Sequence, residues 1–192
     1  MKLSTILAAS VFAISGTLAA TQASAQAYLG ASIGQSDIDE EIAFGLITSG
    51  SVDGKDTAWK LYGGYMLNRS FGIEAAYVNL GAVSYSGDFF GDPVTDGKVE
   101  VTGFNIAGIG SLPISEQLSV FGKLGLFIWE VEASDITGGA PFSDTADGTD
   151  ISFGVGVGYN FTRNLGVRAE WEMFQIDESD ASLISIGVVW RF

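Results

Sequence analysis

The residues from Ile151 to Tyr159 alternate strictly between large and small side chains. Isoleucine, phenylalanine, valine and tyrosine occupy the odd positions, whereas serine and glycine occupy the even positions. A period of two is that of a β-strand, in which successive side chains point to opposite faces. The segment is therefore predicted to be a strand with one apolar face and one face of small residues.

Seven other segments show the same period, which gives eight predicted strands. The eight cover approximately residues 27–36, 57–67, 71–78, 98–112, 118–131, 151–159, 165–173 and 181–192. Long acidic stretches (37–56, 79–97 and 132–149) alternate with short turns (68–70, 113–116 and 160–164), and a compact 177–180 precedes the last strand. This order predicts an up-and-down meander whose long loops lie at one end and whose tight turns and termini lie at the other.

The charged residues in the middle of the strands decide what the apolar face contacts. They all lie on the face that carries glycine and serine, and they are Lys60, Glu74, Lys123, Arg168, Glu170 and Glu172. A lipid-facing Lys or Arg at the bilayer midplane costs about 2–4 kcal/mol, whereas a soluble barrel would place its charges outside. The pattern predicts an all-β, eight-stranded antiparallel up-and-down transmembrane β-barrel over residues 26–192.

The inward charges are expected to pair with one another. Together with Arg191, the six residues form a nearly balanced set, and an eight-stranded barrel is only just wide enough for its own side chains. Inward aromatic residues (Tyr62, Phe121, Phe127 and Trp129) also favour a filled lumen. The strand 98–112 is less regular, because Val99 and Val101 fall on one parity and Phe104 and Ile106 on the other; a bulge near Thr102 and Gly103 would explain the change.

The first 25 residues are predicted to be a cleaved signal peptide. Lys2 precedes an uncharged apolar run from Leu3 to about Leu18, and the small residues Ala23 and Ala25 flank Ser24 as in a signal-peptidase site. Cleavage after Ala25, or two residues later, would give a mature chain beginning at Gln26 or Tyr28. The apolar run is short for a membrane-spanning helix.

Composition excludes several functions. Loss of Lys2 changes the net charge from −14 to −15, which disfavours nucleic acid and anionic membrane surfaces as partners. The chain has no cysteine and no histidine, so thiol catalysis, disulfides and the commonest general base are absent. Asp144, Asp147 and Asp150 are of the residue type that Ca²⁺ prefers, but their spacing is not that of an EF-hand, and a solvated acidic loop is the favoured interpretation. We expect no cofactor, no metal and no catalytic residue.

Several short motifs carry a resemblance to a known family. They are the runs 60–65 (KLYGGY), 71–77 (FGIEAAY), 112–115 (LPIS), 122–125 (GKLG) and 188–192 (VVWRF). In this order they resemble the small outer-membrane barrels that include the OmpA-like transmembrane domain and single-domain porin family proteins. The resemblance implies a place in the bacterial outer membrane, contact with its lipid and lipopolysaccharide, and delivery by periplasmic chaperones. It also implies that Ile186, Val188, Trp190 and Phe192 form the signal that the barrel-assembly machinery reads.

Three functions follow from these observations, and the first is favoured. It is a structural or surface-interaction barrel without catalysis, whose extracellular ligand the sequence does not identify. The second is a narrow porin-like channel for water, ions or small solutes. The third is a lipid A-modifying enzyme, but the lipid A acylases and deacylases that resemble this chain in size rely on a histidine, which it lacks.

Overall fold

The computed structural model describes residues 26–38, 49–53, 55–89, 92–137, 140–176 and 179–192. They form the strands β1 (Gln26–Ile38), β2 (Ser49–Asp53), β3 (Lys55–Met66), β4 (Phe71–Phe89), β5 (Asp92–Pro113), β6 (Leu118–Thr137), β7 (Ala140–Asn160), β8 (Leu165–Ile176) and β9 (Ser179–Arg191). No helix long and apolar enough to cross a membrane occurs in this part of the chain. The predicted signal peptide, with Ala23 and Ala25, lies outside the described residues.

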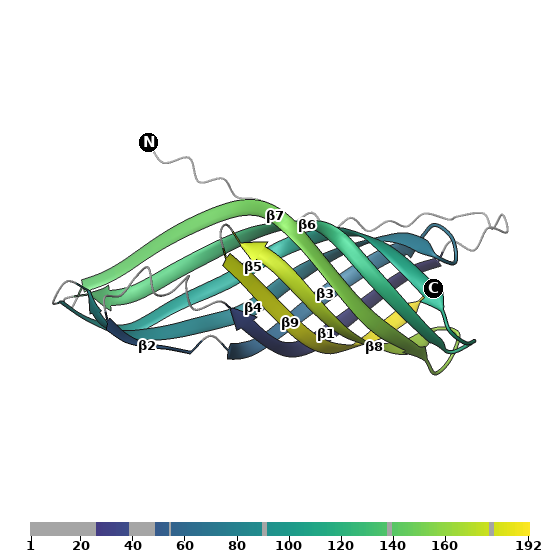
Figure 1. The fold of residues 1–192 in the computed structure, drawn as a ribbon, viewed down its shortest axis with the longest axis horizontal. Coiled ribbons are helices and arrows are strands. Elements are labelled where there is room, and N and C mark those ends of the chain that lie inside the picture. The colour runs from purple at the N-terminus through teal and green to yellow at the C-terminus, as the bar shows by residue number, and fades with distance from the viewer. Residues whose placement is uncertain (1–25, 39–48, 54, 90–91, 138–139, 177–178) are drawn as a thin grey trace.

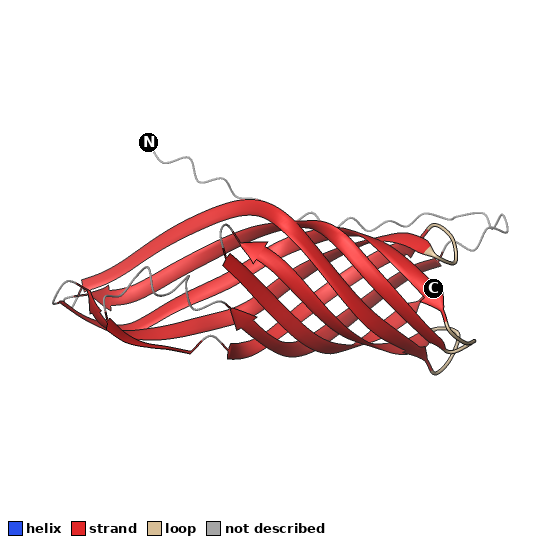
Figure 2. Cartoon of the chain, in the orientation of Figure 1, coloured by secondary structure: helices blue, strands red, loops and turns tan. Residues whose placement is uncertain are grey.

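Eight long strands close into an antiparallel barrel, as the alternating pattern predicts (Figures 1 and 2). Each long strand pairs with the next in sequence, and β9 returns to pair with β1, where Ala31 lies opposite Val188 and Ile33 opposite Ile186. Closure removes both open sheet edges, so the backbone groups of the barrel wall are paired without water. The remaining strand, β2, is short and is not part of the closed barrel. It pairs only with the far end of β4.

The long loops predicted at 79–97 and 132–149 are wrong, because most of these residues continue the strands. Strands β4 and β5 remain paired up to Phe89 and Asp92, and β6 and β7 up to Thr137 and Ala140. Figure 1 shows these four strands projecting well beyond the ends of β8 and β9. Aspartate and glycine favour turns locally, but paired neighbours satisfy the backbone hydrogen bonds of each extension whatever its side chains.

The bulge predicted at Thr102 and Gly103 is also wrong. Strand β5 runs through this region in unbroken register with β6, and Val99 and Val101 point into the barrel while Phe104 and Ile106 point out. The irregularity lies on the neighbouring strand, where two residues of β4, Leu80 and Gly81, stand opposite Val101 alone. Gly81 has a φ of 82°, a conformation that favours glycine.

The outer surface of the barrel is an apolar band. Apolar side chains on the face opposite the lumen charges are exposed there, including Leu29, Leu61, Ile73, Leu124, Val155 and Ile186. Aromatic side chains gather at both borders: Tyr77 contacts Trp59 and Phe104 toward the long extensions, whereas Tyr159 contacts Phe161 beside a short turn. Such a band between two aromatic girdles is the exterior of a membrane barrel.

Candidate functional site: the barrel lumen

The lumen has three successive levels along the barrel axis. A cavity opens at the end of the short turns, a cluster of ionised side chains lies next to it, and an apolar layer follows toward the long extensions. Tyr62, Phe121, Phe127 and Trp129 are all buried, as their inward parity predicts.

The charge cluster joins Lys60, Glu74, Lys123, Arg168, Glu170 and Glu172, all of which are buried. Strand β8 carries three of them at every second position, and β3, β4 and β6 carry one each. Because alternate residues of a strand share one face, the three from β8 all project into the lumen. The cluster therefore connects strands that are not neighbours in the barrel wall.

The two lysines bind the carboxylates of β8 from strands that lie on either side of β8 in the barrel wall. Lys123 Nζ lies 2.6 Å from Glu170 Oε2 and 2.5 Å from Glu172 Oε1, and it also lies 3.2 Å from Glu74 Oε1. Lys60 Nζ lies 3.0 Å from Glu170 Oε2 and contacts Glu172 as well. Each ammonium thus meets at least two carboxylates, which offsets part of the cost of removing it from water.

Arg168 completes the cluster. Its Nη1 donates to Glu74 Oε2 at 2.6 Å, and its Nε lies 2.9 Å from Glu170 Oε1, an ion pair that is not aligned as a hydrogen bond. The hydroxyl of Tyr28 donates to the same Glu74 oxygen at 2.8 Å. The guanidinium carbon lies 4.4 Å from the ring centre of Phe121, so the cation is also held by an aromatic face.

The position of Arg191 differs from the one expected for a member of this network. It lies near the end of β9, where its Nη1 donates to the side-chain oxygen of Asn160 rather than to a carboxylate of the cluster. Inward parity alone does not fix height along the axis: Glu172 lies opposite Leu183, eight residues before Arg191 on β9. Without it, the six buried residues carry three positive and three negative charges and cancel.

Two glycines of β7 provide the room that the cluster needs. A Cβ at Gly154 would lie 2.8 Å from Glu172 Cγ, and one at Gly156 would lie 2.4 Å from the ring of Phe121. Both distances are too short for ordinary contact. The glycines at these two positions of β7 therefore leave space for neighbouring lumen side chains.

The apolar layer was not predicted from the sequence. Its largest fully buried side chains come from six strands and are Ile38, Val78, Leu80, Val99, Val101, Phe127, Phe174 and Leu183. The rings of Phe127 and Phe174 lie 4.6 Å apart between centres. The inward parity of these residues was the available signal, but apolar residues on both faces of a strand hide its period.

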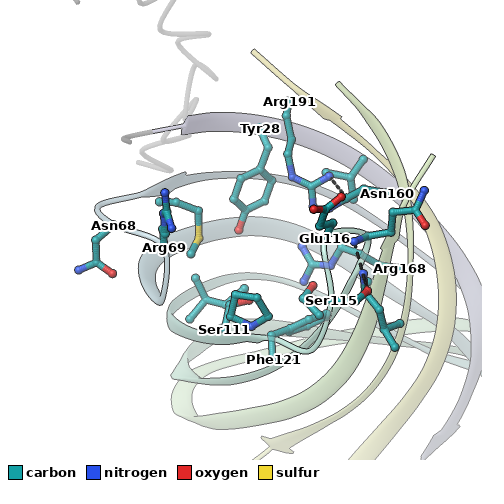
Figure 3. Close-up of a pocket in the computed structure, with 18 residues that line it drawn as sticks. Tyr28, Asn68, Arg69, Ser111, Ser115, Glu116, Phe121, Asn160, Arg168 and Arg191 are labelled. Atoms are coloured by element: carbon teal, nitrogen blue, oxygen red, sulfur yellow. Dashed lines mark hydrogen bonds between the residues drawn. The ribbon is translucent and has the colours of Figure 1, made fainter. Parts of the chain in front are cut away.

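A cavity of about 400 Å³ opens at the short-turn end of the barrel. Figure 3 shows the side chains around it, among them Tyr28, Arg69, Phe121, Arg168 and Arg191. The cavity ends against Arg168 and Phe121, which belong to the closed part of the lumen. Among the described residues there is no group of three or more carboxylates placed to hold a metal ion.

A closed eight-stranded barrel with an apolar exterior and a filled, charged interior defines the small outer-membrane β-barrel class. The chain matches the model of the outer membrane protein beta-barrel domain family over residues 4–192, and it belongs to that family. The family and its members indicate location in the bacterial outer membrane, in contact with lipid.

Curated relatives match most of this chain but less than half of their own length. Outer membrane protein A of Salmonella typhi is 30% identical over 140 residues, which cover 68% of this chain and 39% of that protein. Outer membrane protein A of Shigella flexneri is 29% identical over 140 residues, with the same coverage of 68% and 39%. The matched region thus spans about two fifths of these relatives.

Solved structures show the same fold at low sequence identity. Ail, the attachment invasion locus protein of Yersinia pestis, superposes with a TM-score of 0.60 at 17% identity, over 87% of this chain and 98% of that one. Neisserial surface protein A gives a TM-score of 0.60 at 13% identity, over 86% and 97%. None of these relatives carries the name of an enzyme.

Proposed function

We propose that the protein is a non-conducting outer-membrane barrel that serves a structural role in the membrane and presents its extended strands to the medium. The observation that carries the proposal is the apolar layer stacked on the charge cluster. The apolar layer and the charge cluster would each hinder the passage of ions and solutes by a different physical effect. They occupy successive levels of one lumen.

The apolar layer opposes water. Phe127 and Phe174 are fully buried and in contact with each other, and Val101 and Leu183 are fully buried members of the same layer. A hydrophobic constriction of this kind closes a pore by excluding water, and an ion would have to cross it without hydration. The layer therefore supports a lumen that is closed to ions and polar solutes.

The charge cluster opposes movement of the lumen side chains. Opening a path past Lys123 would separate it from three carboxylates at once. Taking one partner from a buried ion pair costs about 3–5 kcal/mol, because the other charge is left without compensation. We therefore assign Lys60, Glu74, Lys123, Arg168, Glu170 and Glu172 the role of a brace that ties β3, β4, β6 and β8 together across the lumen.

The extensions of β4 to β7 supply the surface for interaction outside the membrane. In sequence they are rich in acidic residues, among them Asp88, Asp96, Glu130 and Asp147, with Lys98 as a rare cation. Ail has been solved with the heparin analogue sucrose octasulfate, a polyanion. An acidic extension would repel such a ligand, so a surface partner of this chain would be neutral or cationic.

Planar-bilayer recording tests the closed lumen. The purified, folded protein should give no stable conductance step above the leak of the bilayer. A matched pair of variants sharpens the measurement: Phe127→Ala combined with Phe174→Ala removes the centre of the apolar layer, whereas Phe104→Ala changes a lipid-facing ring. Reproducible, stable steps from the unaltered protein would favour the narrow channel and reject the structural role.

We further assign export and assembly functions to the two ends of the chain. Residues 1–25 would act as a signal peptide cut after Ala25, and periplasmic chaperones would carry the mature chain. Ile186, Val188 and Trp190 are exposed on the lipid face of β9, and Phe192, which follows β9, is 68% exposed. This outward row supports recognition of the last strand by the barrel-assembly machinery.

A further inference from the structure

The cavity at the short-turn end has an arginine-rich lining. Arg69 comes from the turn between β3 and β4, Arg191 from the end of β9, and Arg168 from the inner wall on β8. Figure 3 shows Arg69 and Arg191 approaching the cavity from separate elements. Three of the four arginines of a chain with a net charge of −14 therefore lie around one cavity.

The charges of this cavity are only partly compensated. Arg168 belongs to the neutral cluster of six, but Arg191 donates to the amide oxygen of Asn160, which carries no charge. Glu116 is the one acidic side chain in the lining. With Arg69 and Arg191 against Glu116, the described lining has an excess of one positive charge beyond the cluster.

A buried donor at the inner end of the cavity is also without a partner. Arg168 is 4% exposed, and its Nη2 has no hydrogen-bond acceptor among the described residues. A buried guanidinium group normally has its donors satisfied, because an unmade hydrogen bond there is costly. The Arg168 side chain lines the inner end of the cavity, and its guanidinium lies over the ring of Phe121.

We propose that this cavity binds a small anion that carries a phosphate group. Guanidinium groups match phosphate oxygens in geometry and charge, and three of them on different elements can surround one such group. The volume of about 400 Å³ is within the range of small-ligand sites and exceeds the needs of inorganic phosphate alone. A phosphate ester fits this chemistry, whether it is a soluble ester or a phospholipid headgroup that reaches over the turns.

Calorimetric titration of the folded protein in maltoside micelles tests the proposal, with inorganic phosphate and glycerol 3-phosphate as probes. Both should bind, and glycerol 3-phosphate should bind more tightly. Arg69→Gln and Arg191→Gln should each weaken binding about tenfold or more, since each removes a charge-assisted hydrogen bond. Arg191→Lys should retain part of the affinity. Heat-modifiable gel migration confirms that each variant is folded.

Arg163 provides a matched control. It lies exposed in the turn between β7 and β8, at the same end of the barrel, but it does not line the cavity. Arg163→Gln should leave binding unchanged, and Glu116→Gln should strengthen it. Equal weakening by Arg163→Gln and Arg69→Gln would show general attraction to a positive surface and overturn the proposal, as would the absence of binding by either probe.

The source of the phosphate is separated by a second experiment. The protein is placed in nanodiscs that contain phosphatidylglycerol, and native mass spectrometry counts the lipids it retains. Loss of one retained lipid in Arg69→Gln and Arg191→Gln, but not in Arg163→Gln, identifies a headgroup as the ligand. Unchanged lipid retention, together with the calorimetric result above, identifies a soluble phosphate ester.

Discussion

Lys123 Nζ lies 2.6 Å from Glu170 Oε2, although the two residues belong to β6 and β8 and are separated in the barrel wall by β7. The contact therefore crosses the lumen instead of following the sheet. Both side chains are buried, so this pair and its neighbours depend on one another for compensation.

Lys123→Met should lower the free energy of unfolding by about 3–5 kcal/mol, because it leaves three carboxylates with too little positive charge. Urea titration of the refolded protein in micelles measures the change. The double variant Lys123→Met/Glu172→Gln restores the charge balance and should recover part of the loss. If Lys123→Met alone is as stable as the unaltered protein, the charge cluster does not brace the barrel.

Phe174→Ala should cost about 3–5 kcal/mol of stability, because it leaves a cavity beside Phe127 in the apolar layer. The same titration measures it. Phe104→Ala serves as the control, since that ring is 56% exposed on the lipid face. Equal losses in the two variants would mean that the layer is not a packed core.

Gly156→Ala should prevent or strongly impair folding, because the added Cβ would lie 2.4 Å from the ring of Phe121 and 2.7 Å from the carbonyl oxygen of Ala169. Gly110→Ala is the matched control on β5, where the nearest atom to the new Cβ is 3.9 Å away. The yield of heat-modifiable protein after refolding compares the two. Similar yields would contradict the tight fit on β7.

Deletion of Phe192 should reduce the amount of barrel assembled in cells far more than it reduces stability in micelles. Phe71→Ala is the control, because Phe71 is 63% exposed and Phe192 is 68% exposed. The two changes should have similar effects on urea unfolding but different effects on outer-membrane yield. If both variants assemble equally well, Phe192 is not part of an assembly signal.

Replacement of Ala23 and Ala25 by Asp should block removal of the first 25 residues, since a signal peptidase requires small side chains at these positions. The precursor should accumulate, and intact-mass measurement detects it. The unaltered protein should begin at Gln26, or at Tyr28 if cleavage follows Ala27. A mature form that starts before residue 20 would reject the predicted site.

The sequence was sufficient to predict strand number, closure and the face of most side chains. It failed where local composition and tertiary pairing disagree. The stretch 79–97 contains several aspartates and glycines, yet it is strand because β4 and β5 continue to pair there. In β5 the apolar residues change from one parity to the other, and the sequence predicts a bulge to explain this. The strand is in fact regular, because Val99 and Val101 point into the apolar layer of the lumen.

What the sequence by itself determined is the direction in which each side chain points, because the two-residue period of a strand is a local property. It thereby separated the lipid face from the lumen and identified six charges that the structure brings together. The tertiary structure decided the height of each residue along the barrel axis, because strand register depends on the partner strand. Register therefore brings Lys123 to Glu170 and leaves Arg191 apart, beside the cavity. It also places an apolar layer between the lumen charges and the long extensions.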